Sequence, residues 1–179
     1  MEPLALILKY YQPDSKSFKI LTNHSRLVAD KALNIASNNP SLKLDLLFIE
    51  QAAMLHDIGI FLTDAPDLGC YGNLPYICHG YLGFELLEKE GYPKHGLVCE
   101  RHTGTGITME EISSKNLPLP LRNYVPLSLE EQLICFSDKF FSKSGDLFQE
   151  KSIKQITTSL AKFGIKSHDK FMEWCELFL

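Results

Sequence analysis

The stretch AAMLHDIG, residues 52–59, decides how the rest of this sequence is interpreted. It sets a histidine and an aspartate, His56 and Asp57, side by side at the end of a segment that is almost wholly apolar. Burying an imidazole and an ionised carboxylate there is costly unless a partner satisfies both groups. A metal ion suits both, so this stretch predicts a helical frame that surrounds a metal ion.

The residues around this stretch follow helical patterns. Apolar residues recur at helical spacing, and the segment that carries residues 52–59 has so little polar face that it should be central and buried. The expected helices cover residues 3–11, 17–37, 45–57, 77–90, 93–102, the segment from Ser128, 152–163 and 167–178. Residues 60–76 are rich in glycine and proline and are expected to form a long irregular loop. There is no convincing strand pattern, so the predicted fold is a compact all-α bundle of about seven to nine helices.

Local signals mark where several of these helices begin or end. Thr108-x-x-Glu111 and Ser128-x-x-Glu131 have the spacing of capping boxes, which favour a helix N-terminus. Gly59 is expected to end the central helix.

Length and composition exclude several classes of protein. A chain of 179 residues fits one domain with a sizeable core, and the formal net charge of -4 argues against a broad basic surface for nucleic acid. The five cysteines form no C-x-x-C pair, which predicts reduced thiols in a cytoplasmic protein rather than a disulfide framework or a zinc knuckle. No apolar run approaches the ~20 residues of a membrane span, so no membrane partner is expected. The oligomeric state stays open.

Four further polar residues can supply ligands to an ion near this stretch. They lie on predicted helices or at the ends of helices: His24, His79, His102 and Asp138. Helices packed as a bundle can bring such side chains to its centre. Imidazole and carboxylate together suit Zn, Fe, Mn or Ni. A carboxylate can also bridge two ions, and such a pair, roughly 3.5–4 Å apart, clamps the attacking and leaving oxygens of a phosphoryl transfer.

Each of these residues also has an ordinary structural explanation. A single histidine such as His24 would more often be a hydrogen-bonded core histidine, and Asp138 alone could be a satisfied core carboxylate. A second His-Asp pair, His168-Asp169, is expected to be structural, because its aspartate falls in the first turn of a surface helix and suits the helix dipole. The pair His56-Asp57 differs from His168-Asp169 because it lies at the end of an apolar helix.

The order of these residues resembles that of a known family. His24, then His56-Asp57-Ile58-Gly59, then Asp138 is similar to the HD-domain metal-dependent phosphohydrolases, in the subgroup whose motif reads His-Asp-Ile-Gly. The local contexts agree with this, with HSRLVA at residues 24–29 and CFSDK at residues 135–139. The resemblance implies an all-α fold, which agrees with the helical patterns.

The resemblance also implies a domain organisation and a set of ligands. Residues 1–179 would form a single HD domain, with a core match at 17–145 and C-terminal helices in 152–178 packing on it. One ion would be bound by four residues: His24, His56, Asp57 and Asp138. A second ion would be bound by the bridging carboxylate and two histidines: Asp57, His79 and His102. One or two divalent ions are implied, which would be Fe, Mn, Ni, Co or Zn, with Mg also possible.

The sequence departs from two branches of this family. The cyclic-dinucleotide phosphodiesterases usually have a lysine after the motif, where this chain has Ile60, and a later Gly-Tyr-Pro signature that is absent from the matching place. Gly91-Tyr92-Pro93 does occur, but before His102, where a helix junction explains it. The Glu-Asp pair of the guanosine-alarmone hydrolases is not found. Mononucleotides, dinucleoside polyphosphates, cyclic nucleotides and small phosphoesters therefore all fit as substrates.

The expected activity is the hydrolysis of a phosphomonoester or phosphodiester in a small, nucleotide-type substrate. A metal-bound hydroxide would attack the phosphorus, since coordination lowers the pKa of water towards ~7. Asp57 would act through the ions, and Arg26 and Lys139 are the nearest cations for holding phosphate. Each lies one or two positions from a predicted ligand, which on a helix turns it roughly 100–200° away, so a surface role is the alternative. Residues 60–76 and Thr103–Gly106 are the expected substrate-facing walls.

Two other functions fit the same ligands. Some HD-domain proteins with this ligand set are diiron oxygenases, which bind the substrate at one iron and O2 at the other. A non-catalytic module that binds a metal or senses a ligand is the third possibility. It is weaker, because six convergent ligands exceed what a structural site needs.

Overall fold

The structure is a computed structural model that describes residues 1–145 and 149–179. It is mainly helical, as the sequence predicts. The described part of the chain contains nine α-helices: α1 (Pro3–Ile7), α2 (Lys16–Asn38), α3 (Leu46–Leu55), α4 (His79–Lys89), α5 (Pro93–Arg101), α6 (Met109–Lys115), α7 (Leu129–Asp138), α8 (Ile153–Ala161) and α9 (Ile165–Phe178). Among these residues, no helix combines the length and the apolar character needed to cross a membrane.

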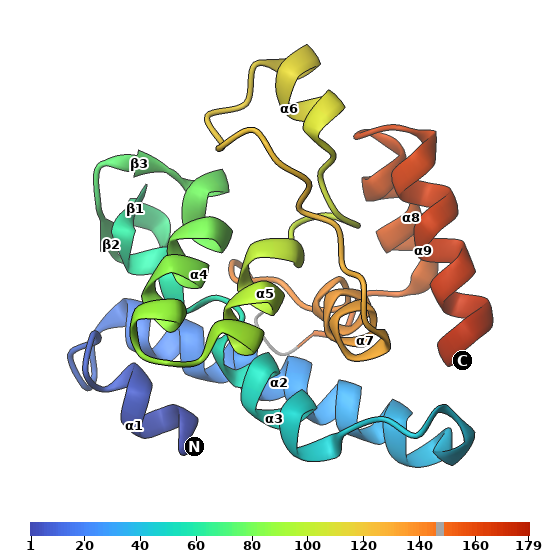
Figure 1. Cartoon of the computed structure of the whole chain (residues 1–179), viewed down its shortest axis with the longest axis horizontal. Coiled ribbons are helices and arrows are strands. Elements are labelled where there is room, and N and C mark those ends of the chain that lie inside the picture. The colour runs from blue at the N-terminus through green and yellow to red at the C-terminus, as the bar shows by residue number, and fades with distance from the viewer. Residues whose placement is uncertain (146–148) are drawn as a thin grey trace.

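The long helix α2 and helix α3 lie side by side, and α4 and α5 pack against each other near them (Figure 1). Helix α7 lies near the centre of the view and contacts α2, α3 and α5. The hairpin of α8 and α9 covers one side of α7, while α6 stands on an extended arm above it (Figure 1). Helices α2, α3 and α5 therefore pack on α7, and α4 packs on α5. The ends of these five helices can share one buried site.

The capping signals are confirmed at one helix and half confirmed at another. The Thr108 hydroxyl accepts a hydrogen bond from the Glu111 N–H, and the Glu111 carboxylate accepts one from the Thr108 N–H, which completes a capping box for α6. Ser128 likewise caps α7 by accepting from the Glu131 N–H. The Glu131 carboxylate does not return this contact, because it accepts from Arg101 and from the N–H of residue 127 instead.

Residues 60–76 differ from the irregular loop that the sequence predicts. They contain β1 (Thr63–Ala65), β2 (Cys70–Tyr71) and β3 (Leu74–Pro75), which form a small sheet in the order β2-β1-β3. Strand β1 pairs antiparallel with β2 and parallel with β3. Strands of two or three residues are too short to show an alternating pattern. The expectation of no strand was therefore wrong here.

Gly59 has a different role from the helix stop that the sequence predicts. Helix α3 ends at Leu55, before Gly59, and Gly59 lies in a short 3-10 helix that follows. A Cβ atom at this position would lie 2.6 Å from the backbone nitrogen of Gly83 and would collide with the carbonyl oxygen of His79. Gly59 therefore lets α4 cross closely against the 3-10 helix Ile58–Leu62, and this crossing positions His79.

The core consists of two hydrophobic clusters that meet along α2 and α3. In α2, Leu21 belongs to one cluster and Val28 to the other. In α3, Leu55 belongs to the first cluster and Ala53 to the second. His24 lies between Leu21 and Val28, at the point on α2 where one cluster gives way to the other. A buried polar site thus has room between two apolar clusters that hold the fold together.

Candidate metal centre

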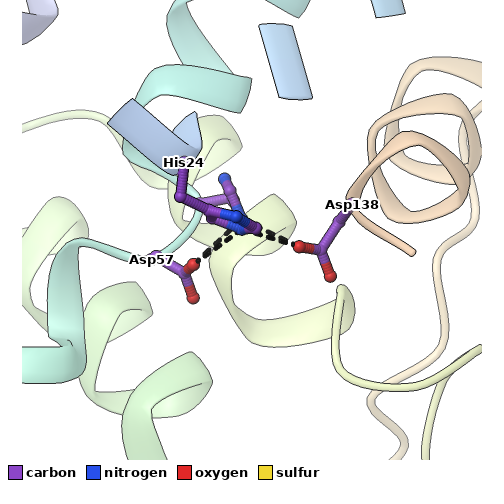
Figure 2. Close-up of side chains that lie close together, drawn as sticks. His24, Asp57 and Asp138 are labelled. Atoms are coloured by element: carbon purple, nitrogen blue, oxygen red, sulfur yellow. Dashed lines mark hydrogen bonds and ion pairs between the residues drawn. The ribbon is translucent and has the colours of Figure 1, made fainter. Parts of the chain in front are cut away.

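Five helices bring six buried polar side chains together. Each is at most 7% exposed. We call them the site cluster: His24 in α2, His56 and Asp57 at the end of α3, His79 at the start of α4, His102 after α5 and Asp138 at the end of α7. All six are residues that the resemblance implies as metal ligands. Figure 2 shows His24, Asp57 and Asp138 pointing toward one another from three separate elements.

Four members of the site cluster form a first group. His24 Nε2 lies 2.8 Å from Asp138 Oδ1 and 3.4 Å from Asp57 Oδ2 (Figure 2). His56 Nε2 lies 3.1 Å from the same Asp57 oxygen and 3.5 Å from the same Asp138 oxygen. One ligand atom from each of the four residues therefore lies within 4.8 Å of the others. Two imidazoles and two carboxylates at this spacing suit one divalent ion.

A second group uses the other oxygen of Asp57. His79 Nε2 and His102 Nε2 each lie 3.3 Å from Asp57 Oδ1. Asp57 thus presents Oδ2 to the first group and Oδ1 to the second, and it is the only residue of the site cluster common to both. This is the arrangement by which one carboxylate bridges two ions.

Backbone carbonyls fix the orientation of three of the imidazoles. The Nδ1–H groups of His56, His79 and His102 donate to carbonyl oxygens three residues earlier, at 2.6, 2.6 and 2.7 Å. A carbonyl oxygen only accepts, so in each ring the proton sits on Nδ1 and the lone pair of the neutral ring sits on Nε2. Contacts of this kind orient metal-binding histidines in proteins. They aim all three Nε2 atoms at the Asp57 carboxylate.

The polar atoms of the site cluster fit a bound cation. His79 Nε2 and His102 Nε2 lie 3.1 Å apart, and with both Nδ1 atoms protonated two lone pairs face each other unless a cation or a shared proton lies between them. Within the described residues, His56 Nε2 and Asp57 Oδ1 are buried with no hydrogen-bond partner. Each such orphan costs about 1–3 kcal/mol. One ion at each group would satisfy these atoms.

Charged neighbours keep both carboxylates of the site cluster ionised. Burial alone would raise the pKa of Asp57, but the Lys143 ammonium together with His56 and His102 outweighs burial and holds that pKa well below the usual range. Burial of Asp138 is outweighed in the same way by Lys139 and Lys143, which lower its pKa. Ionised carboxylates are the form that binds metal.

The histidines differ in protonation. Burial lowers the pKa of His24 and of His102 to about 4, so both rings are neutral at pH 7. Burial also acts to lower the pKa of His56, but the Asp57 and Asp138 carboxylates outweigh it and raise that pKa to about 9. Without metal, His56 therefore binds a proton at neutral pH.

This difference predicts a pH dependence of metal binding. A metal ion needs the neutral form of His56, so a proton and the ion compete for Nε2. The affinity for Mn²⁺ should rise about tenfold per pH unit as the pH approaches the pKa of about 9, and it should level off above it. Competition with a fluorescent chelator at several pH values measures this. An affinity that does not change below pH 9 would contradict the assignment of His56.

Two lysines lie beside the carboxylates. Lys139 Nζ lies 2.7 Å from Asp138 Oδ2 and donates to the carbonyl of His102 at 3.1 Å. Lys143 Nζ lies 2.7 Å from Asp57 Oδ2. The sequence indicates Lys139 by its position next to a predicted ligand. It does not indicate Lys143, because that residue lies in a non-helical segment after α7 where no periodic pattern marks its direction.

The structure places the other cationic candidate away from the site cluster. Arg26 follows His24 by two positions, which turns it to another face of α2. Its guanidinium lies 2.8 Å from Asp30 Oδ1 and 3.1 Å from Glu50 Oε1, which are partly exposed carboxylates. Arg26 therefore has the surface role that was the alternative for it. The expectation that Arg26 is available to bind a phosphate at the site is corrected accordingly.

A cavity of about 780 Å³ opens beside the site cluster. At one end it is lined by Tyr76, Asp138, Lys139 and Lys143. Thr103, Gly104 and Gly106 line it as expected, whereas Tyr76 is the only residue of 60–76 that does so. Its far wall was not predicted and comes largely from α8, whose lining residues are Gln155, Ile156, Ser159 and Leu160. The cavity is thus lined both by Asp138 of the site cluster and by a wall on α8 that offers two polar and two apolar side chains.

Two solved structures with a similar fold are of the HD domain of a phosphodiesterase. The HD domain of the phosphodiesterase PgpH from L. monocytogenes matches with a TM-score of 0.53 and 21% identity, covering 91% of this chain and 86% of that chain. The structure of the same domain in complex with cyclic-di-AMP matches with a TM-score of 0.53 and 19% identity, covering 92% and 86%. At this identity the likeness concerns the fold.

Sequence relatives and one family model also match this chain. An uncharacterised protein of Methanocaldococcus jannaschii is 30% identical over 145 residues, which are 79% of this chain and 78% of that protein. The tRNA (cytidine(56)-2'-O)-methyltransferase of Thermoplasma volcanium is 29% identical over 164 residues, and that of Picrophilus torridus is 31% identical over 138. The matches cover 91% and 76% of this chain but only 41% and 35% of those enzymes. The model of the HD domain matches residues 21–142, and the chain belongs to the HD domain family.

Proposed function

We propose that this protein is a metal-dependent phosphohydrolase that acts on a small, nucleotide-type phosphomonoester or phosphodiester. The observation that carries the proposal is the pair of ammonium groups, Lys139 and Lys143, at the end of the cavity where the site cluster lies. Metal ions and two ammonium groups at one end of a cavity suit an anionic phosphate better than a neutral substrate. Membership of the HD domain family supports the same class. A solved HD domain of this fold belongs to a phosphodiesterase and was determined with a cyclic dinucleotide.

The residues of the site cluster would hold one or two divalent transition ions, with Asp57 between them. Fe, Mn, Ni, Co and Zn suit this set of imidazole and carboxylate ligands. Such ions, when bound, supply Lewis acidity that activates water and neutralises charge on the phosphoryl oxygens. The carbonyl contacts of the three histidines hold their Nε2 atoms in place, so little rearrangement is needed on binding.

The chain's own groups would bind and orient the substrate. Lys139 is held between Asp138 and the His102 carbonyl, and it lines the cavity, so its ammonium can orient a phosphoryl oxygen. The leaving group would extend along the cavity between the turn at residues 103–106 and α8. Apolar residues on that wall, such as Ile156, suit the face of a nucleobase.

Hydrolysis of a chromogenic diester tests the proposal. The protein loaded with Mn²⁺, Fe²⁺, Ni²⁺ or Co²⁺ is assayed with bis(p-nitrophenyl) phosphate and with a panel of nucleotides. Turnover that needs metal and that His56→Ala abolishes supports the proposal. Asp169→Asn is the matched control, because Asp169 is paired with His168 on the exposed surface. O2 uptake with a mixed-valence iron signal and no hydrolysis would instead show a diiron oxygenase, and tightly bound metal with neither activity a binding module.

The wall formed by α8 predicts a size-dependent effect of one substitution. Ser159 is an exposed residue of α8 that lines the cavity, so Ser159→Trp would narrow the cavity without disturbing the core. KM for a nucleotide substrate should rise at least about tenfold, because an indole fills the space of a nucleobase. KM for p-nitrophenyl phosphate should change less than about threefold. Steady-state kinetics measures both.

The residue next to Ser159 in the chain provides a control for this prediction. Thr158 is also exposed on α8 but does not line the cavity, so Thr158→Trp should leave both KM values unchanged. Equal effects of Ser159→Trp and Thr158→Trp would show that α8 is not a substrate wall.

A further inference from the structure

Each carboxylate of the site cluster has its own lysine. Asp57 pairs with Lys143 and Asp138 pairs with Lys139, both at 2.7 Å between nitrogen and oxygen. Both lysine side chains are largely buried, with exposed fractions of 16% and 12%. The two pairs look alike in distance and burial, but the lysines are held differently.

Lys139 and Lys143 have second partners of different kinds: a backbone carbonyl for Lys139, and for Lys143 the side chain of Tyr76, which itself lines the cavity. Lys139 directly follows α7 as its C-cap, and its ammonium has a second fixed partner in the His102 carbonyl at 3.1 Å. Lys143 lies in the non-helical segment after α7, two residues before Gly145, which has a φ of +75° and, among the described residues, no atom within 4 Å of the position that a Cβ would take. Its four-carbon stem is flexible, and it lines the cavity. Its ammonium can therefore swing from Asp57 into the cavity by rotation of its own side chain.

The Lys143 ammonium occupies a position that matters for metal binding. Asp57 Oδ2, which it contacts, is the oxygen that faces His24 and His56 in the first group. A divalent ion and an ammonium group on the same carboxylate oxygen would lie a few ångströms apart and repel each other. The two cations therefore compete for this oxygen.

We propose that Lys143 is an exchangeable counter-ion: it neutralises Asp57 until the first-group ion binds, and it then turns into the cavity, where its ammonium pairs with the phosphate of the substrate. The first step concerns only metal binding. The second step rests on the proposed phosphohydrolase function. Lys143 is thus the counter-ion of Asp57 in the metal-free protein and a binding group for the anion in the metal-loaded protein.

Metal affinity of charge-removing variants tests the exchange. Lys143→Met removes the competitor, so the affinity for Mn²⁺, measured by calorimetry, should increase at least about tenfold. Lys151→Met is the matched control, since Lys151 lines the same cavity but its ammonium contacts the carbonyl of Phe141 rather than a carboxylate. The control should change the affinity less than about threefold. Unchanged or weaker Mn²⁺ binding by folded Lys143→Met, or an equal gain in the control, would overturn the exchange.

A measurement on the unmodified protein covers the case in which Lys143→Met does not fold. A crystal structure of the natural chain with Mn²⁺ should show the Lys143 ammonium outside hydrogen-bond distance of Asp57 Oδ2. An ammonium that stays on this oxygen beside the ion would overturn the proposal.

Binding of inorganic phosphate to the Mn²⁺-loaded protein tests the second step. Lys143→Met should weaken phosphate binding about tenfold or more, because a charge-assisted contact is lost. Tighter Mn²⁺ binding with unchanged phosphate binding would keep the exchange and overturn the phosphate contact. A protein that binds Mn²⁺ as expected but hydrolyses no phosphoester would refute the proposed function and leave the exchange standing.

Discussion

Replacing Asp57 with asparagine is expected to remove both metal ions and to reduce kcat/KM for phosphoester hydrolysis by at least about 10³-fold. Asp57 is the one residue shared by the two ligand groups, and its two oxygens face different histidines. An amide carries no charge and offers one oxygen, so it cannot bridge. Elemental analysis of the dialysed protein gives the metal content, and steady-state kinetics gives the loss of activity.

The stability of the Asp57→Asn variant must be measured together with its metal content and activity. Lys143 would lose its buried partner in Asp57→Asn, and an uncompensated buried charge is destabilising. Urea unfolding and circular dichroism show whether the variant is folded under the assay conditions. Asp169→Asn, in the exposed His-Asp pair, should keep metal content and activity. Folded Asp57→Asn that still binds two ions would contradict the bridging role.

Replacing Gly59 with alanine is expected to destabilise the protein by at least about 3 kcal/mol. The added Cβ would meet backbone atoms of α4, the carbonyl of His79 and the nitrogen of Gly83, and backbone cannot rotate away as a side chain can. The crossing of α4 against the 3-10 helix Ile58–Leu62 must then open. Because this crossing places His79, the second ion should be lost before the first. Urea unfolding measures the stability, and elemental analysis measures the metal.

A substitution at a second glycine distinguishes destabilisation by this collision from destabilisation by ordinary backbone strain. Gly91 has a φ of +87°, and no atom of the described residues lies within 4 Å of the position that a Cβ would take. Gly91→Ala should therefore cost only about 1–2 kcal/mol, the strain of an L-residue in that region. It should keep its full metal content. A cost for Gly59→Ala no larger than that for Gly91→Ala would show that the α4 crossing does not depend on Gly59.

The sequence indicates the centre of this site well because the signal is local. A histidine and an aspartate at the end of an apolar helix need a partner, and this holds for His56 and Asp57 whatever the rest of the chain does. The other ligands are far apart in the chain, and it is the family resemblance, not periodicity, that relates His24 to Asp138. The structure adds that the two hydrophobic clusters meet at His24, which no pattern in α2 alone reveals.

The features that the sequence does not indicate depend on tertiary packing. Lys143 reaches Asp57 from a non-helical segment, where direction cannot be read from spacing. The cavity wall from α8 depends on how the C-terminal hairpin packs on α7, and the strands in residues 60–76 are too short to leave a pattern. Arg26 shows the opposite error, since nearness to His24 in the chain suggested a contact that the helical rotation prevents.

The central claim is that the six buried residues bind metal ions at two adjacent positions. Anomalous diffraction from crystals grown with Mn²⁺ tests this most directly. The expected result is one peak among His24, His56, Asp57 and Asp138, and a second among Asp57, His79 and His102, roughly 3.5–4 Å apart. A map with no peak at either position, under conditions in which elemental analysis finds bound Mn²⁺, would contradict it.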